Sequence, residues 1–198
     1  MSRHLDGTGT GHPVLGFLDL LEQGLDQITG TPAWSLNAEE TTAAITRLST
    51  DLARLAEVET RLIGQVEALD LPGVMGARST AAWLARTTRM TRGEANRKCG
   101  LAKTLRSHEQ TRDAMAAGDV LAEQATVITR AVEALDDDLQ SDKDLAEKHL
   151  IEQAAHFDAH ELRRLGRSCA RSSTPTRPML VRPSGWLSRR SGRGRRRR

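Results

Sequence analysis

The chain has 198 residues and a formal net charge of +3, from 29 lysines and arginines against 26 acidic residues. The charge is unevenly placed, because residues 167–198 hold eleven arginines and no acidic residue. Residues 1–166 have 18 basic against 26 acidic residues, a formal charge of −8. The net charge of the whole chain is therefore no evidence that its folded part binds nucleic acid.

The composition excludes several classes of protein. Aromatic residues make up 3% of the chain and tyrosine is absent, which argues against a β-rich fold and a base-stacking surface. Cys99 and Cys169 have no partner motif, so we expect a reducing compartment and no structural disulfide. No apolar run reaches the length of a membrane span or a signal-peptide core. We therefore expect a cytoplasmic protein with no membrane partner.

Helical periodicity begins near residue 14. A short amphipathic helix is predicted over residues 14–25, ended by Gly30 and Pro32, and residues 1–35 form an N-terminal segment around it. Asn37 and Glu40 then have the spacing of a capping box. After them, apolar residues follow in alternating steps of three and four: Ile45, Leu48, Leu52, Leu55, Leu62, Val66 and Leu69.

This spacing predicts one long helix, roughly 50 Å at 1.5 Å per residue, that ends at Leu71-Pro72-Gly73. Glu59 occupies one position of the apolar series. Two interpretations remain open for it. It lies at the edge facing water, or it is a polar residue that sets the register of an antiparallel hairpin or a dimer.

The chain from residue 77 to residue 166 is predicted to form shorter helices. The expected boundaries are Ser79 or Thr80, Thr91 with Glu94 for a helix to about Leu105, Gly118, a loop at Asp136-Asp137-Asp138, Ser141 with Asp144, and Asp158 for a last helix through Leu165. No segment alternates with the period of a strand. The predicted fold is all-α, an irregular multi-helix bundle with one long amphipathic helix, a helix-turn-helix-like segment and a disordered basic tail.

Several motifs in this part of the chain resemble domain of unknown function 222, the helical N-terminal domain of the 13E12 repeat family. They are residues 77–85 (ARSTAAWLA), 91–95 (TRGEA), 101–102 (LA), 114–125 (AMAAGDVLAEQA) and 162–165 (LRRL). The resemblance covers residues 36–166 in order. It implies an all-helical domain that in other members commonly precedes an HNH endonuclease module.

The nuclease half that the resemblance implies is missing from this sequence. An HNH site needs histidines and an Asn or Asp around a divalent metal ion, and many members add zinc-binding cysteine pairs. After Glu161 the chain has no His, Asn, Asp or Glu. We therefore predict no enzyme activity, no cofactor and no metal ion, and we assign no catalytic residue.

The arginine-rich tail over residues 167–198 has two explanations. With GC-rich codons and a shift of one base, residues 171–187 translate to an acidic, helix-compatible sequence, which suggests a frameshift near residue 170. The gene product would then be a truncated chain, with or without a present function. The alternative is a selected polybasic arm that binds phosphates.

A basic island lies within the acidic domain. Residues 78–106 hold eight basic residues against Glu94 alone, a local charge of +7. On a helical wheel, four candidate nucleic-acid-binding residues share one face opposite the apolar side: Arg92, Asn96, Lys103 and Arg106. In the alternative interpretation, these cations pair with the acidic residues of the flanking segments. The predicted turn has no central glycine, which departs from the usual helix-turn-helix pattern.

Two further groups of residues give weak signals. His156 and His160, with His149 nearby, have metal-ligand spacing, but Asp158 is predicted to begin a new helix between them, so ordinary histidines are favoured. Cys99 lies among basic residues that could lower its pKa, yet no base accompanies it. We interpret it as a small helical residue.

Two functions remain. The domain is a non-catalytic, duplex-DNA-binding part of an HNH endonuclease-like protein, or a protein-interaction module that forms a homodimer through the long helix of residues 37–70.

Overall fold

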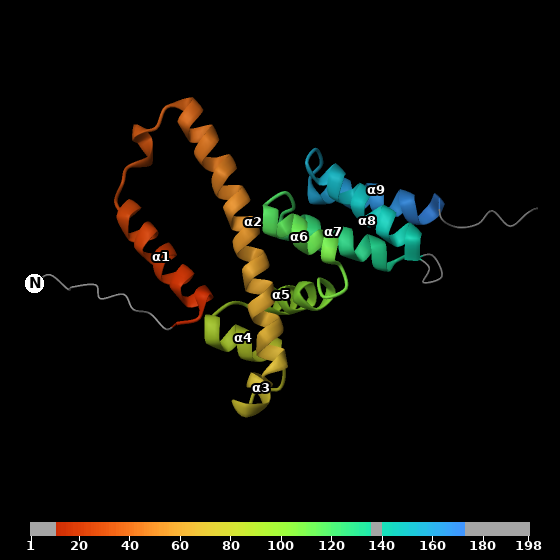
Figure 1. The fold of residues 1–198 in the computed structure, drawn as a ribbon, viewed down its shortest axis with the longest axis horizontal. Coiled ribbons are helices and arrows are strands. Elements are labelled where there is room, and N and C mark those ends of the chain that lie inside the picture. The colour runs from red at the N-terminus through yellow and green to blue at the C-terminus, as the bar shows by residue number, and fades with distance from the viewer. Residues whose placement is uncertain (1–10, 136–139, 173–198) are drawn as a thin grey trace, which may run out of the picture. The chain divides into compact units, whose positions relative to one another are not determined.

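The computed structural model describes residues 11–135 and 140–172, and every regular element within these ranges is a helix (Figure 1). The all-α prediction is confirmed. The predicted loop at Asp136-Asp137-Asp138 and residues 173–198 of the predicted tail lie outside the described residues. None of the helices in the described part combines the length and apolar content that crossing a bilayer requires.

The chain divides into two units, residues 1–48 and 49–198. The first unit contains α1 (Pro13–Ile28), the 3-10 turn η1 (Ala33–Ser35) and the start of α2. Helix α1 matches the predicted short helix, and the chain leaves it through Gly30, whose φ of +84° is a conformation that glycine adopts without strain. No residue of α1 is buried.

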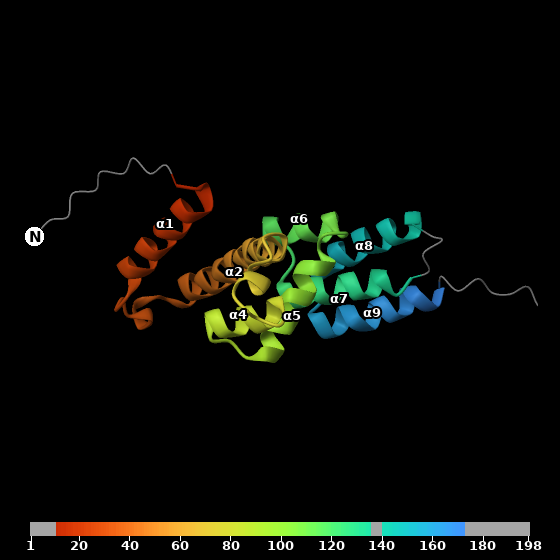
Figure 2. The ribbon, with the colours of Figure 1, turned by 90° about the horizontal axis from the view of Figure 1, so that it is seen from below.

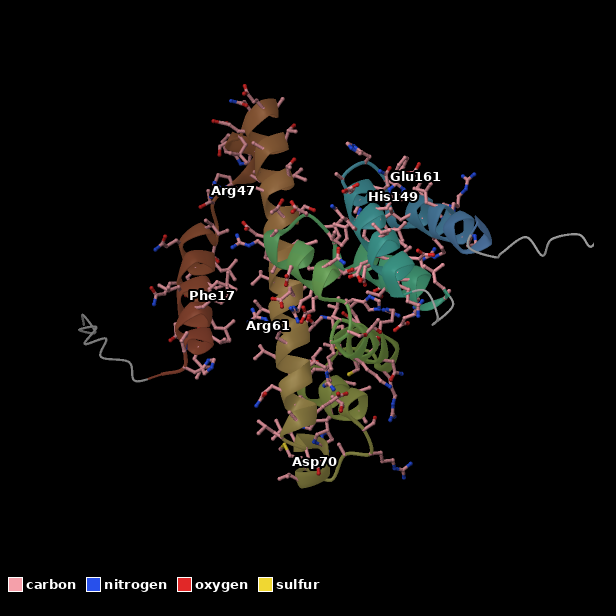
Figure 3. The ribbon with its side chains drawn as sticks, turned by 45° about the vertical axis from the view of Figure 1, so that its right-hand side comes forward. Phe17, Arg47, Arg61, Asp70, His149 and Glu161 are labelled. Carbon is pink, nitrogen blue, oxygen red and sulfur yellow. The ribbon has the colours of Figure 1, made fainter. Side chains whose placement is uncertain are left out.

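Helix α2 (Ala38–Ala68) is the predicted long helix. Its capping box forms in both directions: the Glu40 amide donates to Asn37 Oδ1, and the Asn37 amide donates to Glu40 Oε2, each at 2.9 Å. The helix ends before the predicted Leu-Pro-Gly stop, because Asp70 adopts a left-handed conformation and caps α3 (Leu71–Val74) (Figure 3). Pro72 and Gly73 therefore lie inside this single turn of helix.

The second unit also contains α4 (Thr80–Thr88), α5 (Arg92–Thr104), α6 (Glu109–Ala117), α7 (Ala122–Glu133), α8 (Gln140–Ala154) and α9 (Ala159–Ser172). Helix α7 is central, and it contacts α5, α6, α8 and α9 (Figure 2). The main apolar cluster surrounds it: Leu101, Leu105, Met115, Val120, Ala125, Val127, Ile128, Val132, Leu150, Ala154 and Leu162.

Two predicted boundaries in this unit are wrong. Helix α8 begins at Gln140, so Ser141 and Asp144 lie within the helix rather than at its cap. Asp158 caps α9 as predicted, since its Oδ1 accepts the amides of His160 and Glu161 at 2.8 Å. The helix then continues past Leu165 to Ser172, so residues 167–172 belong to α9 and not to a disordered tail.

Buried polar side chains form hydrogen bonds between the ends of these helices. Gln124 is 7% exposed, and its side-chain amide donates to the carbonyls of Ala154 and Phe157 at 2.8 and 2.9 Å. Its Oε1 accepts the Leu121 amide at 2.9 Å. One side chain thus supplies hydrogen-bond partners to backbone groups at the start of α7 and at the end of α8, which would otherwise be buried without partners.

A second polar contact joins α6 to α8. Glu147 is 5% exposed, and its Oε1 accepts the Thr111 amide at 2.9 Å and the Thr111 hydroxyl at 2.7 Å, while Oε2 lies 3.1 Å from His108 Nδ1. Burial alone would raise the pKa of the Glu147 carboxyl. The hydrogen bonds from His108 and Thr111 outweigh it and hold that pKa below its ordinary value.

We predict that Glu147→Gln lowers the free energy of unfolding by about 1–3 kcal/mol, because hydrogen bonds to a charged buried group are lost. The stabilisation from Glu147 should be complete above the ordinary glutamate pKa of about 4.3 and disappear as the pH falls through its lower folded-state pKa. Urea denaturation at neutral pH and at decreasing pH measures both effects.

The matched control is Glu152→Gln, because Glu152 is an exposed glutamate of the same helix. It should change the unfolding free energy by less than about 0.5 kcal/mol. If both variants are equally stable at neutral pH, the contact between Glu147, His108 and Thr111 does not stabilise the fold.

Candidate nucleic-acid interface

The helix pair α4–α5 begins and turns at residues with short hydrogen-bonding side chains. Ser79 Oγ accepts the Ala82 amide and Thr91 Oγ1 accepts the Glu94 amide, each at 3.2 Å. Between the helices, Arg89 adopts a left-handed conformation with φ of 60°. The turn that lacked a glycine in the sequence therefore takes a conformation in which glycine is common, at the cost of strain in Arg89.

The inner faces of α4 and α5 pack against α2. Their buried cluster joins Ile63 of α2 to Leu84 and to three alanines: Ala81, Ala95 and Ala102. Ala95 is 0% exposed. Because alanine side chains are small, the two helices can approach each other and Ile63 closely. This packing fixes which side of α5 faces outward.

Two ion pairs join α2 to α5 and to the turn that follows α5. Lys98 Nζ lies 2.7 Å from both carboxylate oxygens of Glu59, and Arg106 Nη2 lies 2.7 Å from Glu67 Oε2. The Glu59 side chain is 37% exposed, which agrees with a position at the edge of the apolar series, and its carboxylate pairs with Lys98 of the same chain. The alternative, in which Glu59 sets the register of a hairpin or a dimer, stays a prediction. The interpretation that basic residues pair with the preceding acidic segment holds for Lys98 and Arg106.

The outward face of α5 carries Arg92, Asn96 and Lys103, all exposed, as the helical wheel predicts. Arg78, Arg89 and Arg97 are also exposed. Of the eight basic residues in the predicted island, these five have no hydrogen bond or ion pair with the described part of the chain: Arg78, Arg89, Arg92, Arg97 and Lys103. We call them the free cations.

Arg106 does not belong to the predicted face. Helix α5 ends at Thr104, so a helical wheel no longer applies at position 106. The Arg106 guanidinium instead bonds to Glu67 and, at 3.5 Å, to the Gly64 carbonyl. Glu67 therefore offsets the charge of Arg106. Arg89 and Arg97 are exposed in its stead. A helical wheel of α5 does not include Arg89, because this residue lies in the turn before the helix.

Histidine and cysteine positions give no metal centre in the part of the chain that is described. Helix α8 ends at Ala154 and α9 begins at Ala159, so His156 and His160 are not on one continuous helix, and His149 lies further back on α8 (Figure 3). No group of three metal-ligating side chains forms among the described residues. For Cys99, burial and then the Glu67 carboxylate raise the pKa of the thiol above its ordinary value, contrary to the effect expected of its basic neighbours.

A second group of basic side chains lies between α7 and α9. Arg130, Arg163 and Arg167 line a hollow of about 320 Å³ whose floor includes Ala131 and Gly166. All three arginines are exposed. These arginines can serve as a charge-matched control when the cations of α5 are mutated.

Two glycines of the second unit should respond to alanine in opposite ways. Gly100 lies within α5 and a Cβ there would meet nothing within 4 Å, so Gly100→Ala should raise the free energy of unfolding by about 0.5–1 kcal/mol. Gly118 has φ of +91° and a Cβ there would collide with Thr50. Gly118→Ala should therefore be destabilising. Denaturant unfolding of the two variants checks both signs, and stabilisation by alanine at position 118 would contradict the structure.

Comparison with known proteins identifies the family of this helical domain. The family model described as "Domain of unknown function (DUF222)" matches residues 42–186. This match extends past residue 170, near which the sequence suggested a change of reading frame. No curated protein and no solved structure matches the chain. Because the family model covers well over half of the sequence, the chain belongs to the family of domain of unknown function 222.

Proposed function

We propose that this domain binds duplex DNA through the outward face of α5 and has no catalytic role. The observation that supports this most is the presence of the five free cations in a folded region whose charge is otherwise negative. Through Ser172, the chain has 20 basic against 26 acidic residues, a formal charge of −6. Cations that stay together without carboxylate partners in such a background favour a polyanion as their partner.

The start of α5 is well suited to a phosphate group. The first N–H groups of a helix have no acceptor within the helix, and the helix dipole favours negative charge there. Arg92 is the first residue of α5 and Arg89 precedes it in the turn. The two cations are unfavourable at this end of the helix in the unbound protein, where Glu94 of the first turn offsets only part of their charge, and a bound phosphate would make their position favourable.

The same face offers a group that can discriminate among bases. Asn96 lies about one turn after Arg92, and its amide can donate to and accept from an adenine edge in the major groove. Lys103 lies near the other end of the helix, about 16 Å from Arg92 at 1.5 Å per residue. Positioning contacts would thus lie at both ends, with a base contact between them.

The setting of this function is part of the proposal. We place it in the cytoplasm and assign the chain to the DNA-binding, non-catalytic part of an HNH endonuclease-like system. The residues of an HNH site do not follow Glu161 in this sequence. DNA binding is therefore proposed without cleavage, and incubation with plasmid and Mg²⁺ should leave the DNA intact.

The test uses a chain that ends at Ser172, because α9 continues to that residue and because nine tail arginines would bind any polyanion. It should bind duplex DNA at low salt despite its charge of −6. Arg92→Ala combined with Lys103→Ala should weaken binding to all sequences. It should also reduce the slope of log affinity against log salt by about 2, since each phosphate contact releases counterions. Fluorescence anisotropy at several salt concentrations gives both quantities.

The control removes the same charge elsewhere, as Arg130→Ala with Arg163→Ala at the hollow between α7 and α9, where neither arginine has an ion pair with a described residue. This variant should keep most of the affinity and nearly the full slope. An equal loss in both variants would mean that binding responds to overall charge and not to α5, and the absence of binding at low salt would overturn the proposal.

Asn96→Ala should have a different effect. Losing a base contact costs about 1–3 kcal/mol of discrimination and leaves phosphate contacts in place. Selection of bound sequences from a random duplex library, with the parent and the variant, should show a weaker preference at one position for the variant. An unchanged preference would exclude Asn96 as a base-reading residue.

A further inference from the structure

The hollow between α7 and α9 has an apolar floor and a cationic rim. The two helices belong to the same unit and lie side by side (Figure 2). They approach so closely that a Cβ added to Gly166 would lie 2.6 Å from the Ala131 Cβ. The floor consists of Val127, Ala131, Ala134 and Gly166. Because these residues are small and the arginines around them are long, a hollow of about 320 Å³ remains between the helices, which is the size of a small-molecule site.

The charges of the rim are not offset by the described part of the chain. Arg130, Arg163 and Arg167 form no hydrogen bond or ion pair with a described residue. Arg130 lies in the last turn of α7, where the helix dipole favours a cation. Arg163 and Arg167 lie about one turn apart within α9, and like charges at this spacing are unfavourable. Glu133 follows Arg130 on α7, but it lines a different hollow with Lys143.

We propose that the hollow between α7 and α9 binds a small organic diphosphate, with its phosphates against the three arginines and its organic part on the apolar floor. A guanidinium group is a planar fork that donates to two phosphate oxygens at once. At neutral pH the terminal phosphate carries about two negative charges and the inner phosphate about one, which together match the three guanidinium charges. The bound anion removes the repulsion between Arg163 and Arg167. None of the lining residues belongs to α4 or α5, so this site and the proposed DNA binding can fail separately.

The side chains that line the hollow also predict what the site does not select. All of the described lining residues are arginine, alanine, valine or glycine, so their side chains offer no carboxylate, amide or hydroxyl group. Without a polar group to contact a base edge, the site does not distinguish one nucleotide base from another. Without a carboxylate, it offers no side-chain ligand to Mg²⁺. Mg²⁺ therefore competes with the arginines for the phosphate oxygens and does not strengthen the complex.

Amide chemical-shift titration of the isotope-labelled full chain tests the site, because it separates the hollow from the tail arginines residue by residue. ADP should shift the amides of residues 127–134 and 163–167 along one saturable curve. GDP should bind with the same affinity. Pyrophosphate should bind more weakly, because it leaves the apolar floor uncovered. An excess of Mg²⁺ should weaken the binding of ADP.

Substitution of Arg163 tests the recognition of the phosphates. Arg163→Ala should weaken ADP binding about tenfold, since charge-assisted hydrogen bonds are lost. Arg163→Lys should also weaken it, because lysine keeps the charge and lacks the fork. The control Lys148→Ala removes one exposed positive charge from α8 and should leave the affinity unchanged. Both residues are exposed, so helical circular dichroism should be the same in all variants.

Several results would overturn the proposed site. Shift changes that do not saturate or that are confined to the tail would do so, as would tighter binding of ADP in Mg²⁺. An Arg163→Lys variant with the affinity of the parent would contradict recognition by guanidinium forks. Asp136, Asp137 and Asp138 follow α7 in the chain. If the parent does not bind ADP while a variant with Asp136→Asn, Asp137→Asn and Asp138→Asn does, the chain's own carboxylates occupy the hollow and the diphosphate site is wrong.

Discussion

The packing of α5 on α2 is the constraint on which the rest of this domain depends. Ile63 of α2 inserts among the small residues of α4 and α5, and the ion pairs of Lys98 with Glu59 and of Arg106 with Glu67 lie along the same helix. The ion pairs are partly exposed, so on their own they add little stability. Together with the apolar contact, they determine the rotation of α5 and therefore which of its side chains face outward.

This rotation of α5 separates the residues of the basic island into a paired group and an outward-facing group. Lys98 and Arg106 offset the acidic charge of α2, whereas the free cations remain outside with the exposed amide of Asn96. Helix α2 takes part in this division, because the face that carries Ile63 packs against α4 and α5. Local charge, more than the net charge of the chain, thus indicates where a partner would bind.

Most helices and caps could be predicted from the sequence, because capping side chains and apolar spacing act over a few residues. Asn37 with Glu40, Ser79, Thr91, Gly118 and Asp158 all cap or end helices as predicted. The predicted position of Arg106 on the outward face is wrong, because the helix ends at Thr104 and a helical wheel does not apply beyond it. The environments of Cys99 and Glu147 depend on residues distant in sequence, Glu67, His108 and Thr111, and no local pattern contains them.

The central claim is that the outward face of α5 contacts DNA, and amide chemical-shift mapping tests it most directly. A short duplex is titrated at low salt into the isotope-labelled chain that ends at Ser172. We predict that the largest shift changes occur at residues 89–103, including the amides of Arg92, Gly93 and Asn96 at the start of α5. Changes concentrated at Arg130, Arg163 and Arg167, or on α2, would contradict the account.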